Sequence, residues 1–371
     1  THIHRRGEFL QAAERVEPGV LSFLHSFPDG APRDRLSFAR WLVDPANPLV
    51  GRVTVNRHWA VLFGRGLVRT VEDFGFQGEL PSHPELLDWL AVEFVGTDKG
   101  QGSRDKGQTG MSDSGPRPLT LDPRPSVKRL HRLLVTSATY RQSSRVAPEL
   151  LRRDPENVLL ARGPRVRLEA ELVRDAALHA AGLLSQKIGG PSVFPPQPAS
   201  VTTEGTYGRL DWKASEGDDR YRRSLYTFSK RTAPFAMYAT FDAPSGEACV
   251  ARREVSNTPL QALTLLNDTV FVEAAQELGR WAAELPVHGD GVAAVEERMI
   301  ALVRRCLTRP PDTEELRLLL DFHDEQKCRL ATGELNAGMI GGGHPDGAIE
   351  VAAWTSVARA VMNLDEFIGT R

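Results

Sequence analysis

One group of polar residues has side chains that could bind a metal ion or transfer protons. It consists of Asn56, Arg57, Asp73, His83 and Arg141. Carboxylate and imidazole groups act as metal ligands and as general acids or bases, and guanidinium groups bind anions through two parallel hydrogen bonds. We treat these five residues as a candidate polar cluster.

The spacing of this group argues against a metal site. His83 and Asp88 are five residues apart on one expected helix, so they diverge by about 140° around its axis. His58 lies on a different expected helix. We therefore predict no bound metal. Instead, we expect Ser82–Glu85 to form a capping box and Asp73 to accept backbone amides in a turn.

A second group is rich in arginine and aromatic residues. It consists of Arg222, Arg223, Tyr226, Arg252 and Arg253. Guanidinium contacts and ring stacking could recognise a sulfate, a carboxylate or the edge of a sugar. Alternatively, these arginines tie helices together by pairing with the acids Glu169, Glu171, Asp175 and Asp242. We favour the structural interpretation. In the structural interpretation, Arg252 or Arg253 could also pair with Asn267 and Asp268. These two residues are expected within a helix and would need partners if buried.

The composition excludes several classes of protein. Among 371 residues, 46 Lys and Arg stand against 48 Asp and Glu, and the formal charge of −2 gives no general attraction to nucleic acid. No run of about 18 apolar residues is present, so we expect no membrane insertion. The cysteines Cys249, Cys306 and Cys328 form no Cys-x-x-Cys-His motif, so this segment cannot itself attach a c-type haem. We expect no cofactor in it.

The spacing of apolar residues predicts a mainly α fold, a multi-helix globular domain with a few short β-strands. We expect residues 1–33 to form a strand-like segment and a loop, and residues 34–371 to form an α-rich domain. A flexible insertion is expected at 96–125, which is rich in Gly, Ser and Asp, and a sub-domain seam near 190–220.

Apolar stripes and helix-end signals give the expected elements. A short strand is expected at 221–228. His131 falls on the helix expected from 126 onward, beside an apolar stripe, and we interpret it as exposed or packed rather than as a catalytic base. The other expected helices are 34–43, 49–63, 82–95, 167–185, 258–285, 291–307, 313–331 and 349–367.

Many ordered motifs resemble one family. They include Asp44-Pro45-x-Asn47-Pro48-Leu49, Asn56-Arg57-x-Trp59, Phe63-Gly64-Arg65-Gly66-Leu67, Ser82-His83-Pro84-Glu85-Leu86-Leu87, Thr139-Tyr140-Arg141-Gln142-Ser143-Ser144, Arg222-Arg223-Ser224-Leu225-Tyr226, Arg252-Arg253 and Thr258-Pro259-Leu260-Gln261-Ala262-Leu263. The chain thus resembles the C-terminal domain of unknown function of planctomycetal cytochrome-c-type proteins, the planctomycete-specific PSD-type domain.

The resemblance implies a periplasmic or secreted location and, as partners, the other domains of the same parent chain, such as cytochrome-like modules. It also suggests a link to polysaccharide processing, but no established activity. Three hypotheses follow: a non-catalytic binding or docking module, an enzyme acting on a sulfated polysaccharide, and a surface for an electron-transfer partner. An enzyme would need Asp73, His83, Arg141, Arg223 and Arg253 in one pocket, whereas a docking module would not.

Overall fold

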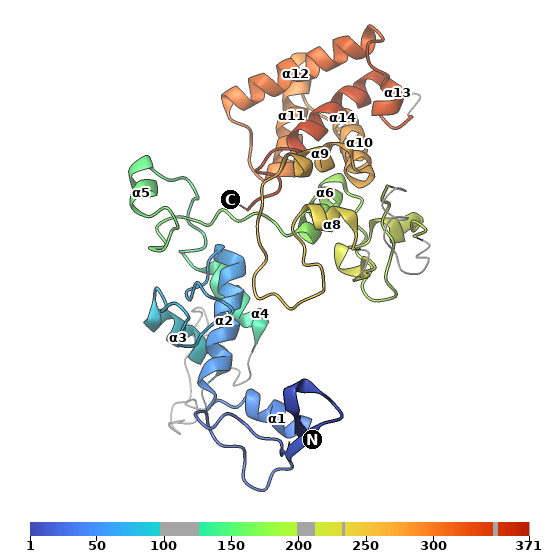
Figure 1. Ribbon diagram of the computed structural model, residues 1–371. Helices are drawn as coiled ribbons and strands as arrows, with labels where there is room; N and C mark the ends of the chain where they lie inside the picture. Colours follow the sequence, from blue (N-terminus) through green and yellow to red (C-terminus); the bar gives the residue numbers. More distant parts are fainter. Residues whose placement is uncertain (97–125, 199–211, 232–233, 344–347, 371) are drawn as a thin grey trace, which may run out of the picture. The chain divides into compact units, whose positions relative to one another are not determined.

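The computed structural model describes residues 1–96, 126–198, 212–231, 234–343 and 348–370 and is dominated by helices (Figure 1). The chain divides into two compact units, Thr1–Pro164 (unit 1) and Arg165–Arg371 (unit 2). The only sheet in the described part is a two-stranded hairpin, and the prediction of a mainly α fold is confirmed. Nearly all of the expected insertion at 96–125 and part of the 190–220 stretch lie outside the described residues, so the insertion and the seam remain predictions.

Unit 1 starts with a hairpin and continues with helices. Its elements are β1 (His2–His4), a 3-10 turn (Arg5–Gly7), β2 (Ala12–Arg15), α1 (Arg35–Leu42), α2 (Pro48–Phe63), α3 (Pro84–Val95), α4 (Val127–Thr136) and α5 (Pro148–Arg153). Trp41 on α1 holds the preceding loop, because its indole Nε1 donates to the carbonyl of His25 at 2.9 Å and the two rings stack. The expected helices of this unit are present, and α5 is an additional one.

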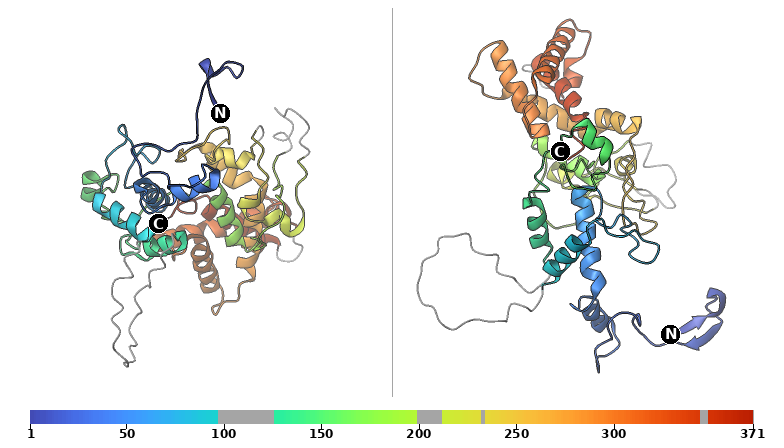
Figure 2. Two further views of the ribbon diagram at one scale, coloured as in Figure 1. Left: turned by 90° about the horizontal axis from the view of Figure 1, so that it is seen from below. Right: turned by 90° about the vertical axis from the view of Figure 1, so that its left-hand side faces the viewer.

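The helix α2 is the centre of unit 1 and has clear end signals. The side chain of Asn47 accepts a hydrogen bond from the amide of Leu49 at 3.0 Å, Pro48 occupies the first turn, and Gly64 ends the helix with a left-handed φ of 77°. The helices α3 and α4 lie beside α2 (Figure 2). Their packing buries its apolar side. The buried residues of this core are Val55, Trp59, Phe63, Leu67, Val68, Leu87, Leu90, Leu130 and Leu134.

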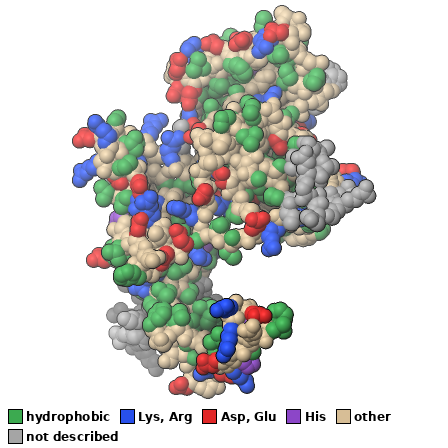
Figure 3. All heavy atoms as spheres, in the orientation of Figure 1, with side chains coloured by type: hydrophobic (Ala, Val, Ile, Leu, Met, Phe, Trp, Pro, Cys, Tyr) green, Lys and Arg blue, Asp and Glu red, His purple; other side chains and the backbone are tan. Residues whose placement is uncertain are grey.

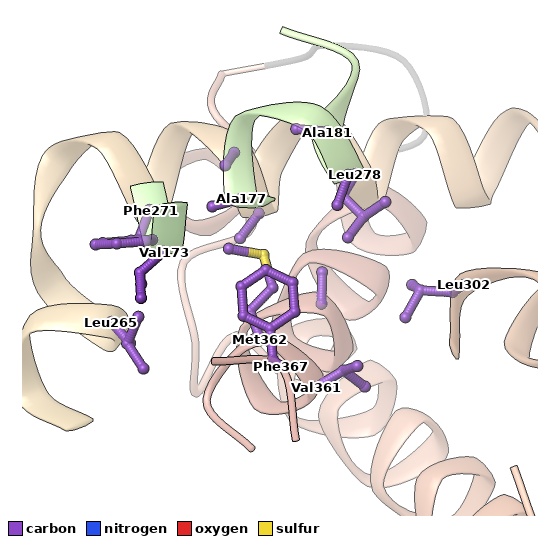
Figure 4. Close-up of a cluster of buried hydrophobic side chains, with 14 of the residues drawn as sticks. Val173, Ala177, Ala181, Leu265, Phe271, Leu278, Leu302, Val361, Met362 and Phe367 are labelled. Carbon is purple, nitrogen blue, oxygen red and sulfur yellow. The ribbon is translucent and has the colours of Figure 1, made fainter. Parts of the chain in front are cut away.

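Unit 2 is a helical bundle, with irregular loops and 3-10 turns between α6 and α8. Its elements are α6 (Ala170–Ala181), two 3-10 turns (Gly217–Tyr221 and Ser224–Tyr226), α8 (Ala236–Thr240), α9 (Pro259–Asn267), α10 (Thr269–Glu284), α11 (Val292–Leu307), α12 (Thr313–Ala331), α13 (Ala337–Ile340) and α14 (Ala348–Met362). Side chains from α6, α9, α10, α11 and α14 and from the segment after α14 meet in one apolar core (Figure 4).

The helices α10 and α14 of unit 2 pack closely against each other. A Cβ atom added to Gly279 on α10 would lie 2.4 Å from Oγ1 of Thr355 and 2.6 Å from its backbone nitrogen. Only a glycine allows this approach, since methyl groups do not tolerate such distances. Trp354, Val357 and Val361 are completely buried beside this contact.

The two ends of unit 2 are hydrogen-bonded to each other. The amide of Leu168 donates to the carbonyl of Ile368 at 2.7 Å, and the amide of Thr370 donates to the carbonyl of Val166 at 2.8 Å. Arg309 reinforces the later segment, because its guanidinium contacts both Glu366 and Glu315. The last residues therefore close the unit against its first ones.

Two expectations about elements of unit 2 are wrong. The helix expected over 258–285 is interrupted at Asp268, whose backbone is extended and whose carboxylate caps α10 by accepting from the Val270 amide at 3.0 Å. Asn267 and Asp268 therefore end one helix and begin the next, and need no arginine. The strand expected at 221–228 forms 3-10 turns with isolated bridges, Ser185 to Arg222 and Val193 to Thr227.

Candidate functional site

Asn56 holds a loop of unit 1 in place. Its side chain is completely buried on α2, where Nδ2 donates to the carbonyl of Val68 at 2.9 Å and Oδ1 accepts from the amide of Val68 at 2.8 Å. Gly66 lies against it, because a Cβ there would come within 2.9 Å of both amide atoms. Both hydrogen-bonding ends of this amide are therefore used within the protein.

Asp73 closes its own turn. Its Oδ1 accepts from the amide of Gly75 at 2.7 Å, and its carbonyl accepts from the hydroxyl of Thr70 at 2.8 Å. The predicted role of this carboxylate as an amide acceptor in the turn is confirmed. The tight approach of Gly78, where a Cβ would lie 2.2 Å from the Asp73 carbonyl oxygen, shows that the turn is closely packed.

The start of α3 differs from the expected capping box. Ser82 directs both its amide and its hydroxyl to the carbonyl of Leu67, at 2.8 and 3.2 Å, and His83 is the N-cap residue without a capping side chain. Pro84 in the first turn has no amide hydrogen, which leaves one donor fewer to satisfy. The imidazole Nδ1 of His83 lies 3.0 Å from the Ser82 hydroxyl, so this histidine contacts its own neighbour.

The two arginines of the first group are free of such contacts. Arg57 on α2 and Arg141 after α4 are exposed, and neither guanidinium has a hydrogen bond or an ion pair within the described residues. Asp88 is paired with Arg52 at 2.6 Å, which lowers the pKa of that carboxyl through the hydrogen bond. The contacts of Asn56, Asp73 and His83 are thus separate local ones, and the residues described give no contact that joins the first group into one site.

A histidine pair joins two helices of unit 1. His131 Nε2 on α4 lies 2.9 Å from His58 Nδ1 on α2, and the rings meet edge to face at 74° with centroids 4.7 Å apart. Partial burial and the neighbouring ring lower the pKa of His58. The sequence analysis did not pair them, because His58 and His131 are distant in the sequence and only the packing of α2 against α4 brings them together.

Arg222 organises a loop of unit 2 from inside. It is completely buried, donates to the carbonyl oxygens of Gly189 and Pro191, and places its guanidinium carbon 3.7 Å from the ring centroid of Tyr226. The Tyr226 hydroxyl in turn accepts from the amide of Gly189 at 2.8 Å. Arg222 therefore pairs with carbonyls and a ring, and not with an acid as the structural interpretation expected.

The other arginines of the second group differ from one another. Arg253 forms a bidentate pair with Glu171 on α6, at 2.6 and 3.1 Å, and Arg223 approaches Asp175 at 3.6 Å. Both arginines thus pair with the expected acids, but they lie in loops and join loops to α6. Burial raises the pKa of Glu171, but the hydrogen bond and charge of Arg253 outweigh it and hold that pKa below its usual value. Arg252 is exposed and has no such partner within the described residues.

A polar junction of unit 2 contains Asp242, an acid that the sequence analysis expected to pair with an arginine, but its partner is Arg167. Arg167 and Ser256 both bond the carboxylate of Asp242, at 2.5 Å and 2.9 Å, and Gln261 donates to the carbonyl of Thr240 at 3.0 Å. Burial raises the pKa of Asp242, but the hydrogen bonds from Arg167 and Ser256 hold it below its usual value. Asp242 has a left-handed φ of 60°, which is unusual for a residue with a side chain. Arg167 and Asp242 are far apart in the sequence, so no spacing signal could predict this contact.

Two hollows of the described residues lie away from both groups. One hollow lies between α3 and α4 beside Arg129 and Leu133, and a second, open one lies along the 153–159 loop. Neither is lined by a residue of the two groups. On the face in Figure 3 the basic and acidic side chains are interspersed. No set of three or more His, Cys, Asp or Glu side chains among the described residues is arranged to hold a metal ion.

The cysteines and the helix lengths complete the chemical inventory. Cys249, Cys306 and Cys328 are all free thiols, and burial raises the pKa of Cys306 to about 12. The described helices include none that is long and apolar enough to cross a membrane. The three cysteines thus form no disulfide with one another.

Fold and site together define a helical protein of two units, in which several of the candidate polar side chains bond backbone atoms or carboxylates of the chain itself. The chain belongs to the PSD1 family, described as a protein of unknown function (DUF1553), whose model matches residues 34–101 and 121–323. The resemblance to a PSD-type domain of unknown function is therefore confirmed. No curated protein and no solved structure matches the chain.

Proposed function

We propose that this chain is a non-catalytic binding and docking module of a larger extracytoplasmic, cytochrome-c-type protein with a role linked to polysaccharide processing. The observation that supports this most is the use of the candidate chemical groups. Asn56, Asp73 and Arg222 bond backbone atoms, and Arg253 bonds an internal carboxylate. A catalyst needs such groups aimed at a substrate, and a docking module does not.

An exposed apolar face in unit 2 is the docking surface that we propose. Leu260 and Leu263 are three residues apart on α9, so they share one side of the helix, and more than half of each side chain is exposed. Val255 precedes them and is also exposed, and Arg252 adds a positive charge nearby in the chain. These residues lie within the part that matches the family. The resemblance implies other domains of the same parent chain as partners, so such a domain is the partner we assign to this surface.

The test measures how tightly the 371-residue chain binds the proposed partner. The double variant L260Q/L263Q should lose at least tenfold in affinity for the cytochrome-like domain of the parent protein, because burying two leucines contributes about 1.5–3 kcal/mol each. The control L318Q changes a leucine of similar exposure on α12 and should bind normally. Equal binding by all three proteins would contradict the docking face.

The enzyme hypothesis is tested on the same samples. We expect neither sulfate nor new reducing ends to be released from a sulfated polysaccharide by the wild-type chain. If the wild-type chain releases sulfate or new reducing ends and D73N or H83Q does not, the enzyme hypothesis would replace the docking hypothesis. Binding of the cytochrome-like domain that depends on its redox state would instead favour the electron-transfer surface.

A further inference from the structure

The histidine pair of unit 1 has the geometry of two metal ligands. His58 follows Val55 by one turn of α2, and His131 lies between Leu130 and Leu134 on α4. Val55, Leu130 and Leu134 are buried in the core of unit 1, so the helices that carry both rings are fixed by packing. The imidazoles therefore need no large rearrangement to act together.

The distance between the two nitrogens is that of a hydrogen bond, and it also fits two ligands of one ion at a 90° angle. Two nitrogens about 2.0–2.1 Å from one ion lie about 2.9 Å apart at a 90° angle, and about 3.3 Å apart at a tetrahedral angle. His131 Nε2 and His58 Nδ1 are 2.9 Å apart. Ring centroids would be about 4.5 Å apart in the first case and about 5.2 Å in the second, and the structure has 4.7 Å.

Against the prediction from sequence that no metal is bound, we propose that His58 and His131 chelate one divalent transition-metal ion in neighbouring positions of a tetragonal site, with Cu²⁺ as the preferred ion. Imidazole suits Cu²⁺, and this ion stands highest in the affinity order of the first-row divalent metals. Within the described residues no third His, Cys, Asp or Glu side chain joins the pair, so water completes the coordination.

Binding requires no net loss of a proton from the pair. When both rings are neutral and hydrogen-bonded to each other, one donates its N–H to the other, so only one of the two facing nitrogens has a free lone pair. When the ion enters, this proton moves to the other nitrogen of its own ring. Both rings stay neutral, and both facing nitrogens then bind the ion.

The experiment titrates the 371-residue chain with CuCl₂ in a buffer that does not bind copper. His2 and His4 are two residues apart on one exposed strand and would bind Cu²⁺ themselves, so every variant carries H2Q and H4Q. We expect one Cu²⁺ per chain and an electron paramagnetic resonance spectrum with two coupled nitrogens. H58Q and H131Q should each lower the affinity at least tenfold, because even outer-shell changes cost 10–100-fold.

Two further variants sharpen the result. H288Q changes a fully exposed histidine of unit 2 and should bind Cu²⁺ like the parent. K128Q should strengthen binding, because Lys128 lies one turn before His131 and its charge repels the ion. Unchanged affinity in both H58Q and H131Q, or a loss in only one of them, would overturn the chelate. His131 is exposed, so H131Q decides the question if H58Q fails to fold.

Discussion

Replacing Arg253 with alanine separates a structural from a ligand-binding role for the second arginine group. Arg253 and Glu171 are each 28% exposed and are joined by two hydrogen bonds. Breaking a fully buried ion pair costs about 3–5 kcal/mol, and hydrogen bonds to charged groups are worth about 1.5–3 kcal/mol. Because the freed Glu171 regains part of its hydration, we expect R253A to lower the free energy of unfolding by about 2–3 kcal/mol at pH 7.

The neighbouring arginine provides the control. Arg252 is exposed and has no hydrogen bond or ion pair in the described part of the chain, so R252A should stay within about 0.5 kcal/mol of wild type. For a unit of this size R253A should lower the melting temperature by about 4–12 °C, which differential scanning calorimetry resolves. Equal stability of R253A and R252A would refute the reasoning, and lost ligand binding by a stable R253A would support recognition.

The same pair predicts a pH dependence. The pKa of Glu171 in the folded protein is below its ordinary value of 4.5, so its contribution to stability is complete above that pH. It is lost as the pH falls through the folded pKa. The stability difference between wild type and R253A should therefore be constant near neutral pH and shrink below about pH 4.5. Urea unfolding at a series of pH values measures this difference, and a gap that widens in acid would contradict the assignment.

Three further substitutions test other contacts. G279A gains about 1 kcal/mol of helix propensity but forces a methyl group against the backbone of Thr355, so a net loss of about 1–3 kcal/mol is expected in thermal unfolding. N56A leaves the buried amide and carbonyl of Val68 without partners and should cost about 2–4 kcal/mol, with its effect confined to the unfolding of unit 1. D242N keeps a residue type that tolerates a left-handed φ but removes the charge. It should lower stability at pH 7, and urea unfolding should show the deficit shrinking below about pH 3.8, because the pKa of Asp242 is depressed from that value.

The features that sequence could predict are the local ones. Helix ends follow from short-range chemistry, and the caps at Asp34, Asn47 and Asp312 form as their residue types indicate. The turn at Asp73 is equally local. Asp268 shows the limit: it sits in a continuous apolar pattern, but its carboxylate caps a new helix because α9 and α10 change direction there.

The contacts that sequence could not predict depend on pairing over long distances. The His58–His131 contact needs the packing of α2 against α4, and the Asp242 junction needs Arg167 from a segment far earlier in the chain. The pairing of Arg253 with Glu171 was anticipated by charge, but Arg222 has the same charge and bonds carbonyl oxygens. Residue type thus limits the set of partners, and tertiary packing selects among them.

The hydrogen bonds between Val166–Leu168 and Ile368–Thr370 make unit 2 a nearly closed ring of polypeptide. A short peptide linker could join these two segments directly, and new ends could then be opened at an exposed position such as Gly333, giving a circular permutant with the same core. For the same reason, the unit could be inserted into a surface loop of another protein without forcing the two sides of that loop apart. The closeness of its two ends therefore suits unit 2 to transfer into other proteins.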